Sequence, residues 1–259
     1  MTTAAIDAAA RLSVVREWFY ARMAVACLMV GMLGFAPTYW APLAEGTSRV
    51  PPLIHVHAAL FFGWLLFSTS QAWLVASGRT VRHREMGLIG ISIATAMLFV
   101  GLALSIQRIL MLEAAGQGEA ARRFAVIPVT SITFFALMFA LAIANVRRPQ
   151  VHKRLMLVAT ISILQAAVGR VFLILAGVRS SRGDLPPLPP SVAVSILPGL
   201  IVDLLIVIAI VHDYRTTGRV HKVYWIGGAA VVALQLVRVP LSATDAWLQF
   251  TYWLTAFAG

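Results

Sequence analysis

Long apolar blocks alternate with short polar connections along this chain. A transmembrane helix needs about 20 consecutive, mostly apolar residues to cross a hydrocarbon core of about 30 Å. The pattern therefore predicts an all-α fold, a polytopic transmembrane helix bundle of about seven spans. The predicted spans cover residues 18–42, 53–77, 86–107, 124–146, 154–178, 192–213 and 223–243.

The connections are too short to fold separately, so residues 1–259 are predicted to form a single transmembrane domain. Residues 1–17 form a polar N-terminal segment, and residues 18–243 form the seven-helix bundle. The last stretch, 244–259, is short and aromatic. These features predict a C-terminal helix in the membrane interface and not an eighth span.

The composition supports this prediction and excludes other classes of protein. Hydrophobic residues make up 60% of the chain, charged residues make up 12%, and the mean hydropathy is +0.85. A soluble domain is nearer half apolar and a quarter charged, which excludes an ordinary cytosolic enzyme and a disordered chain. Cys27 is the single cysteine, which excludes an intramolecular disulfide and a cysteine-rich metal site.

The chain has 21 basic and 10 acidic residues and a net charge of +11. In a soluble protein this excess would indicate nucleic-acid binding. Here the basic residues lie in short connections between apolar blocks, so we expect the lipid bilayer and no nucleic acid as a partner. Basic connections of this kind set the orientation of a membrane protein, because the more basic loops stay in the cytoplasm.

Alternate connections differ in their basic charge. The more basic set holds twelve residues, namely Arg11, Arg16, Arg79, Arg82, Arg84, Arg147, Arg148, Lys153, Arg154, Arg215, Arg219 and Lys222. The other set holds six, namely Arg49, Arg108, Arg122, Arg123, Arg179 and Arg182. The bias predicts a multi-pass protein of the bacterial inner (cytoplasmic) membrane, with its N-terminus in the cytoplasm and its C-terminus outside.

Three of the basic connections share a histidine pattern. His83, His152 and His221 are separated by 69 residues in both intervals, and a basic residue follows each of them. A small residue also stands seven positions after each histidine. Equal spacing with matching chemistry indicates an internal repeat. We therefore predict one lone helix followed by three hairpin repeats.

Two interpretations of these three histidines stay open. An imidazole beside a cation is a common interfacial anchor, with the apolar part buried and the charge in water. Alternatively, two of the three rings face each other and ligate a metal, as axial ligands of a haem b iron, because imidazole suits iron. The neighbouring cations weigh against metal binding, since like charges repel.

Three charged residues lie deep inside predicted spans, Arg170, Asp203 and Arg238. An ionised group at this depth is costly and requires a partner or a wet cavity. Side chains lean toward the N-terminus of their own helix, so we expect the three to converge. One interpretation is a buried Arg170–Asp203 ion pair that fixes helix register. Gln165 and Gln235 also lie in spans, and we expect them to form interhelical hydrogen bonds.

The other interpretation is an anion-binding pocket, because two cations and one carboxylate leave one positive charge over. His55 and His57 lie at the same end of the bundle as these arginines. Positions two apart on a helix point in nearly opposite directions, so the pair cannot chelate one metal. We predict an outer ligand-binding pocket formed by His55 or His57 with Arg170, Asp203 and Arg238.

The stretch HVHAALFFGWLLFSTSQAWLVASGRTVRHREMGLIG carries a resemblance to known proteins. A histidine opens one helix, a glutamine closes it, and His-Arg-x-x-Gly opens the next, at His57, Gln71, His83, Arg84 and Gly87. The chain resembles a large group of uncharacterised bacterial seven-helix membrane proteins in these positions. The stretches GFAPTYW, RPQVHKRLMLVATISILQAAVGR and PGLIVDLLIV extend the resemblance over most of the chain. The resemblance implies the fold and brings no established activity.

More loosely, the helix-borne histidines are similar to those of membrane b-type cytochromes, which implies haem b as a cofactor. Those proteins place histidine pairs deep in the bundle toward both leaflets, whereas His83, His152 and His221 crowd one interface here. The chain also lacks a phosphate-binding glycine loop, a Gly-x-Ser-x-Gly and a His-Glu-x-x-His motif. No catalytic residue is therefore predicted.

Three functions fit these observations. The first is a redox protein that holds haem b. The second is a carrier or receptor for a small anionic or lipophilic ligand. The third is a non-catalytic subunit or assembly factor of a larger membrane complex, with membrane proteins as partners.

Overall fold

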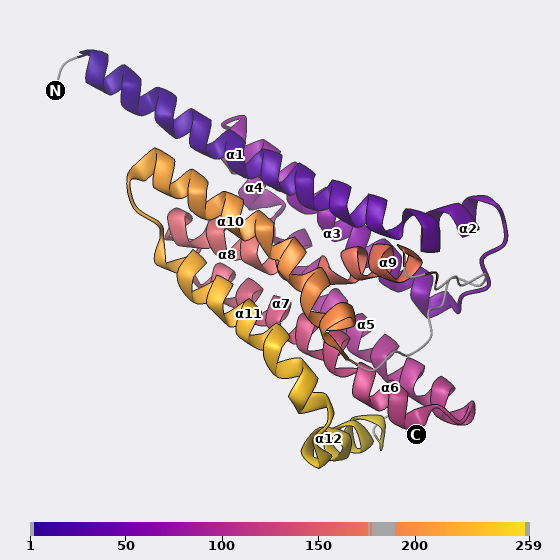
Figure 1. The fold of residues 1–259 in the computed structure, drawn as a ribbon. Coiled ribbons are helices and arrows are strands. Elements are labelled where there is room, and N and C mark those ends of the chain that lie inside the picture. The colour runs from indigo at the N-terminus through magenta and orange to yellow at the C-terminus, as the bar shows by residue number, and fades with distance from the viewer. Residues whose placement is uncertain (1–2, 176, 178–189, 257–259) are drawn as a thin grey trace.

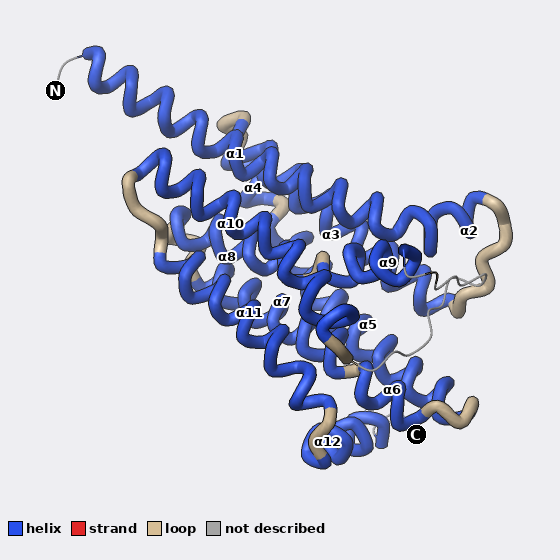
Figure 2. Tube along the Cα trace, in the orientation of Figure 1, coloured by secondary structure: helices blue, strands red, loops and turns tan. Residues whose placement is uncertain are grey.

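The computed structural model describes residues 3–175, 177 and 190–256, and all regular structure within these ranges is helical (Figure 1, Figure 2). The predicted all-α fold is confirmed. The first half of the chain holds α1 (Thr3–Phe35), the π-helical turn η1 (Ala36–Trp40), α2 (Ala41–Ala44), α3 (Pro52–Ala76), α4 (Thr80–Glu85), α5 (Gly87–Ala114) and α6 (Gly118–Phe124). The second half holds α7 (Val126–Ala144), α8 (Pro149–Ser162), α9 (Gln165–Leu175), the π-helical turn η2 (Val192–Ile196), α10 (Leu197–Thr217), α11 (Lys222–Ser242) and α12 (Asp245–Ala256).

Seven helical segments of the described chain are long and apolar enough to cross a membrane. They are Glu17–Ala44, Pro52–Ala76, Gly87–Ala114, Gly118–Ala144, Pro149–Leu175, Ala193–Thr217 and Lys222–Ser242. These segments match the seven predicted spans. The chain is therefore a polytopic membrane protein with seven spans.

The spans pack side by side in a bundle with two distinct ends. α1 packs against α3 and α9, α5 lies between α3 and α7, and α10 packs against α8, α9 and α11. The connections that carry α4, join α7 to α8 and join α10 to α11 lie at one end, which we name the α4 end (Figure 1). The other end carries α2, α6 and α12 and is named the α6 end. The more basic connections therefore gather at one end of the bundle.

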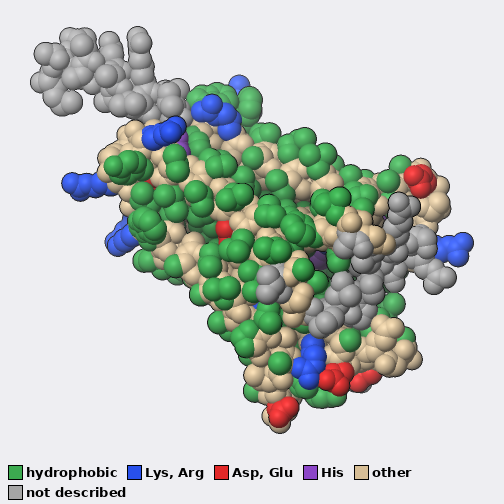
Figure 3. All heavy atoms as spheres, in the orientation of Figure 1, with side chains coloured by type: hydrophobic (Ala, Val, Ile, Leu, Met, Phe, Trp, Pro, Cys, Tyr) green, Lys and Arg blue, Asp and Glu red, His purple; other side chains and the backbone are tan. Residues whose placement is uncertain are grey.

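The interior and the surface of the bundle are both apolar. Cys27, Trp64, Met97, Phe135 and Val158 are completely buried in the core. Large apolar side chains also remain exposed on all seven spans. In Figure 3 hydrophobic side chains cover the middle of the visible face, and charged side chains gather toward its ends. This distribution suits contact with lipid along the middle of the spans.

Three spans are irregular in the half nearer the α6 end. The first span changes to the π-helical turn η1 after Phe35, next to Pro37, which lacks the N–H of a regular helix. The fifth span is interrupted between α8 and α9 at Ile163 and Leu164, and η2 opens the sixth span. Irregular backbone at membrane depth requires cover from protein, and it often marks a functional site.

Four span ends lie four or more residues from their predicted positions. The fifth span begins at Pro149 instead of 154, and the sixth ends at Thr217 instead of 213. The predicted third span ends at 107, but α5 continues to Ala114, and the fourth span begins at Gly118 instead of 124. Charged residues end the apolar pattern there, yet Arg122 is buried and forms an ion pair with Glu113 (Nη2–Oε2, 2.8 Å). The predicted end of the fifth span at 178, with Arg179 and Arg182, lies outside the described residues.

The C-terminal segment forms a separate short helix, α12, which packs on α5, α6 and α11. The Trp247 indole Nε1 donates a hydrogen bond to the carbonyl of Arg122 (2.8 Å). The Arg122 guanidinium donates to Thr255 Oγ1 (3.2 Å) and lies 3.8 Å from the centroid of the Tyr252 ring. Tyr252 and Trp253 are exposed. Exposed aromatic rings of this kind are typical of a helix at a membrane interface.

Candidate functional site

Buried polar residues gather near the middle of the bundle, where α7, α9, η2, α10 and α11 meet. They form two hydrogen-bonded groups, one around Arg238 and one that joins Asp203 to Gln235. We name these residues the central network: Thr130, Ser131, Gln165, Ser195, Asp203, Gln235 and Arg238.

The first group surrounds a buried arginine with neutral oxygen atoms. Arg238 is 2% exposed. Its Nε donates to Thr130 Oγ1 and its Nη2 to Ser131 Oγ, both at 2.7 Å, and its Nη1 donates to Gln165 Oε1. Gln165 Nε2 then donates to the carbonyl of Ser195 (2.6 Å). Charged donors form strong hydrogen bonds, so the Arg238 guanidinium links α11 to α7 and α9, and through Gln165 to η2.

The second group is a carboxyl group and an amide. Asp203 is 7% exposed, and its Oδ2 accepts a hydrogen bond from Gln235 Nε2 at 3.0 Å. Arg238 is close enough for its charge to act on Asp203, but the two form no ion pair. Asp203 Oδ1, Gln235 Oε1 and Ser195 Oγ are buried without a hydrogen-bond partner in the described structure. Asp203 Oδ1 and Gln235 Oε1 are therefore acceptors without a donor in the described part of the chain, whereas the Ser195 hydroxyl can both donate and accept.

A different group lies nearer the α6 end. We name it the arginine cluster, formed by Arg108 on α5, Arg170 on α9 and His57 on α3. Arg108 is close enough to repel the charge of Arg170, and Arg170 is close enough to act on His57. The Arg170 guanidinium lies 4.1 Å from the centroid of the Phe35 ring and donates to the Ala166 carbonyl of its own helix (3.0 Å).

Aromatic rings continue the arginine cluster toward η1. The Phe62 ring contacts Phe35 and Trp40, with centroids 5.6 Å and 4.7 Å apart. Trp40 Nε1 and His57 Nδ1 are buried without a hydrogen-bond partner among the described residues. An indole N–H can only donate, and an imidazole nitrogen can carry a hydrogen. Trp40 Nε1 is therefore a donor without a partner among the described residues, and His57 Nδ1 is a donor in the tautomer that places the hydrogen on this nitrogen.

The five residues of the predicted pocket lie in three places: His57 and Arg170 in the arginine cluster, Asp203 and Arg238 in the central network, and His55 outside both. His55 Nδ1 is hydrogen-bonded to the Tyr39 hydroxyl (3.0 Å). Arg170 and Asp203 form no ion pair in the part of the chain that the structure describes. Of the three charged residues that we expected to converge, Asp203 and Arg238 lie in the central network. Arg170 lies apart from them, in the arginine cluster.

Four residues of these two groups were not predicted as site residues from the sequence: Arg108 and the hydroxyl residues Thr130, Ser131 and Ser195. Hydroxyl side chains in apolar helices usually bond to their own backbone, so they give little signal. One signal was present in the spacing. Ser195, Gly199 and Asp203 recur every four residues, which places them along one face of a helix.

No family model, curated protein or solved structure matches this chain. The function is therefore inferred from the sites themselves. Among the described residues, no group of three or more His, Cys, Asp or Glu side chains is placed to hold a metal ion.

The three repeated histidines lie at the α4 end in two arrangements. His83 on α4 and His152 on α8 have ring centroids 6.4 Å apart and ring planes at 71°. His152 Nδ1 is hydrogen-bonded to the Ala142 carbonyl (2.8 Å), so this nitrogen carries a hydrogen. His221 is the N-cap of α11, and its Nδ1 accepts from the Val223 N–H (3.2 Å).

Burial affects the charge of these histidines. It lowers the pKa of His83 below the ordinary value of 6.5, and the charges of His152 and Arg84 lower that pKa further. Burial and the charge of Arg154 lower the pKa of His221 in the same way. Both imidazoles are therefore neutral at neutral pH, which is the form that binds metal ions.

A buried ion pair that the apolar pattern did not predict lies beside His221. Arg154 Nε donates to Asp213 Oδ2 (2.9 Å), its Nη2 donates to Oδ1, and both side chains are 3% exposed. Asp213 Oδ2 also accepts from the His221 N–H (3.2 Å). The hydroxyls of Tyr20 and Tyr224 bond to each other (3.1 Å), and both rings lie near the Arg154 guanidinium. This cluster joins α1, α8, α10 and α11.

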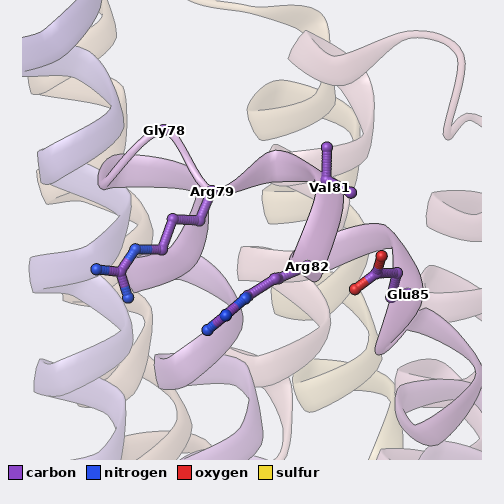
Figure 4. Close-up of a pocket in the computed structure, with 5 residues that line it drawn as sticks. All are labelled: Gly78, Arg79, Val81, Arg82 and Glu85. Carbon is purple, nitrogen blue, oxygen red and sulfur yellow. The ribbon is translucent and has the colours of Figure 1, made fainter.

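A shallow hollow opens on the surface beside α4. Figure 4 shows its lining residues, Gly78, Arg79, Val81, Arg82 and Glu85, with Arg79 and Arg82 extending to the same side. All five residues are exposed. The hollow shares no residue with the central network or the half-buried arginine cluster, and the candidate site is assigned to those two groups.

Proposed function

We propose that this membrane protein binds a small anion, a carboxylate or a phosphate, at the arginine cluster. The observation that carries the proposal is the Arg170 guanidinium, which lies 4.1 Å from the Phe35 ring centroid inside a membrane-spanning helix, within electrostatic range of Arg108 and His57. Like charges repel strongly where the dielectric constant is low. An anion between them would offset this repulsion, and guanidinium groups bind carboxylates and phosphates in bidentate geometry.

The surroundings of the cluster support an anion with an apolar part. Among the described residues, Trp40 Nε1 and His57 Nδ1 are buried nitrogen atoms without a hydrogen-bond partner, and each can donate a hydrogen bond to an anion. Phe35 lies under the Arg170 guanidinium and packs against Phe62. Aromatic walls with a few polar groups are typical of small-molecule sites.

The predicted orientation places this cluster toward the outside of the cell. The α6 end carries fewer basic residues in its connections, and the positive-inside rule directs such an end away from the cytoplasm. A ligand would then enter from outside. This access suits a carrier or receptor for a small anionic ligand.

Replacing Arg170 by glutamine is expected to weaken anion binding by about ten- to a hundredfold, because a hydrogen bond to a charged group contributes about 1.5–3 kcal/mol. Isothermal titration of the detergent-purified protein with benzoate and with inorganic phosphate measures this effect. Benzoate tests a carboxylate with an apolar ring, and phosphate tests the anion alone.

Arg49→Gln is the matched control, because Arg49 is exposed and lies at the same end of the bundle. This variant removes the same charge without touching the cluster, so its affinity should equal that of the wild type. The proposal fails if neither probe binds the wild type, or if Arg170→Gln binds both probes as tightly as Arg49→Gln does.

A second candidate, a redox protein that holds haem b, is supported by the His83–His152 pair. Two metal–nitrogen bonds of about 2.0–2.1 Å place the two nitrogens about 4 Å apart. Rings whose centroids are 6.4 Å apart can reach this separation. The Ala142 carbonyl would orient His152 as a ligand, as outer hydrogen bonds commonly do. A haem in this position would supply one-electron transfer.

A visible absorption spectrum tests the second candidate. The protein, produced with haem available, should show a Soret band and a sharp α-band after reduction with dithionite. His83→Ala and His152→Ala should both lose these bands. His221→Ala should keep them, because His221 caps α11 at a separate position. A colourless wild-type protein excludes this function.

A further inference from the structure

Two buried aspartates on α10 have different partners. Asp213 is 2% exposed and forms an ion pair with Arg154. Asp203 is 7% exposed and is hydrogen-bonded to the neutral amide of Gln235. An ionised carboxylate away from water requires a cation or several donors. Asp213 has such partners, whereas Asp203 has one amide N–H.

The hydrogen bonds around Asp203 leave two acceptors without a donor. Gln235 Nε2 donates to Asp203 Oδ2 at 3.0 Å. Asp203 Oδ1, the second oxygen of the carboxyl group, and Gln235 Oε1, the single oxygen of the amide, are buried without a hydrogen-bond partner among the described residues. A buried acceptor without a donor is costly, and the cost rises in a low dielectric.

The Gln235 amide cannot move to a position in which these two acceptors would gain donors. Gln235 lies directly on Gly199, where an added Cβ would be 2.5 Å from Gln235 Cδ and 2.7 Å from its Nε2 and Oε1. Exchanging the amide oxygen and nitrogen would set Oε1 against Asp203 Oδ2. This arrangement would again place two acceptors against each other.

Charged groups from the neighbouring helices do not replace the missing donor. Arg238 on α11 acts on Asp203 through its charge, but its N–H groups donate to Thr130, Ser131 and Gln165. The other charged side chains with described contacts on the packed helices are engaged elsewhere. They are Arg154 with Asp213, Lys153 with Glu17, and Arg170 over Phe35.

We propose that Asp203 and Gln235 form a proton-binding site in the middle of the bundle, with the hydrogen on Asp203 Oδ1 donated to Gln235 Oε1. A carboxylic acid both donates and accepts, and so does a carboxamide. One hydrogen therefore satisfies both leftover oxygens. Uptake forms one O–H bond with a hydrogen ion from water and converts the carboxylate into the neutral acid. This site is independent of the proposed anion site.

Infrared spectroscopy of the purified protein at neutral pH tests the site directly. The wild type is expected to show the carbonyl band of a protonated carboxylic acid, which lies well above the carboxylate bands. Asp203→Asn should remove this band. Asp213→Asn, on the same helix, should keep it, because Asp213 is ionised in its pair with Arg154.

Thermal unfolding of the same two variants gives a second result. Asparagine at 203 resembles the neutral acid and supplies an N–H for Gln235 Oε1, so its melting temperature should equal that of the wild type. Asparagine at 213 leaves Arg154 unpaired and should lower the melting temperature clearly.

Two results would overturn the proposal. One is a wild-type spectrum whose protonated-acid band is absent or survives in Asp203→Asn. The other is a loss of melting temperature in Asp203→Asn as large as that in Asp213→Asn. If Asp203→Asn does not fold, Gln235→Leu provides the test. Removing the acceptor of the acid hydrogen should shift the band, and an unshifted band contradicts the pair.

Discussion

Asparagine in place of Asp213 is expected to lower the free energy of unfolding by about 3–5 kcal/mol. Arg154 would then remain buried without its counter-charge, because both side chains of the pair are 3% exposed. Asparagine has nearly the same size as aspartate, so packing changes little. Denaturation of the detergent-purified protein, followed by the loss of helix signal, measures the effect.

Two controls separate the loss of charge from other effects of the substitution. Glu119→Gln removes the carboxylate of the exposed Glu119–Arg123 pair and should cost less than about 1 kcal/mol. The double variant Arg154→Met with Asp213→Leu removes both buried charges and should recover most of the stability. If the double variant is no more stable than Asp213→Asn, uncompensated charge does not explain the loss.

Alanine in place of Gly34 is expected to destabilise the bundle by about 1–3 kcal/mol. A Cβ at Gly34 would lie 2.6 Å from the carbonyl oxygen of Ala167 and 2.7 Å from its Cβ. Backbone atoms cannot move aside as a flexible side chain can, so α1 must shift away from α9. The same shift would move Phe35 from the Arg170 guanidinium. Thermal unfolding and benzoate titration of one preparation would report both effects.

Gly63→Ala is the control for this packing effect. No atom lies within 4 Å of a Cβ added at Gly63, which stands inside α3. Alanine there should stabilise the helix by about 0.5–1 kcal/mol, because glycine loses more backbone freedom on folding. Equal losses of stability in the two variants would show that close approach at Gly34 is not the cause.

The spans could be predicted from the sequence because the bilayer fixes the length of an apolar helix. Some of the span ends could not be predicted. At the third and fourth spans the reason is that the pairing of Arg122 with Glu113 depends on contact between α5 and α6. A charged residue ends an apolar window whether its side chain faces water or a buried partner. Hydropathy alone does not separate these cases.

The depth of the charged residues was also predictable, but their partners were not. Arg170 and Arg238 were both expected to meet Asp203, yet Arg170 lies over Phe35 and Arg238 bonds to Thr130. Depth follows from position along a helix. The direction in which a side chain points follows from the rotation of the helix about its axis, which packing determines.

The environments of the three repeated histidines could not be predicted from the sequence either. Equal spacing suggested three equivalent environments for His83, His152 and His221. The structure gives His83 its own short helix α4, places His152 in the first turns of α8 and makes His221 an N-cap. Local connections at the bundle end decide these positions, and the internal repeat itself stays a prediction.

The interruption of the fifth span at Ile163 and Leu164 has a mechanical consequence. α8 is held to α10 by the Arg154–Asp213 pair at one end, and α9 carries Arg170 at the other. A continuous helix tilts as one rigid unit, whereas a break in a helix allows the parts on its two sides to tilt by different amounts. α9 can therefore adjust around Arg170 without tilting α8.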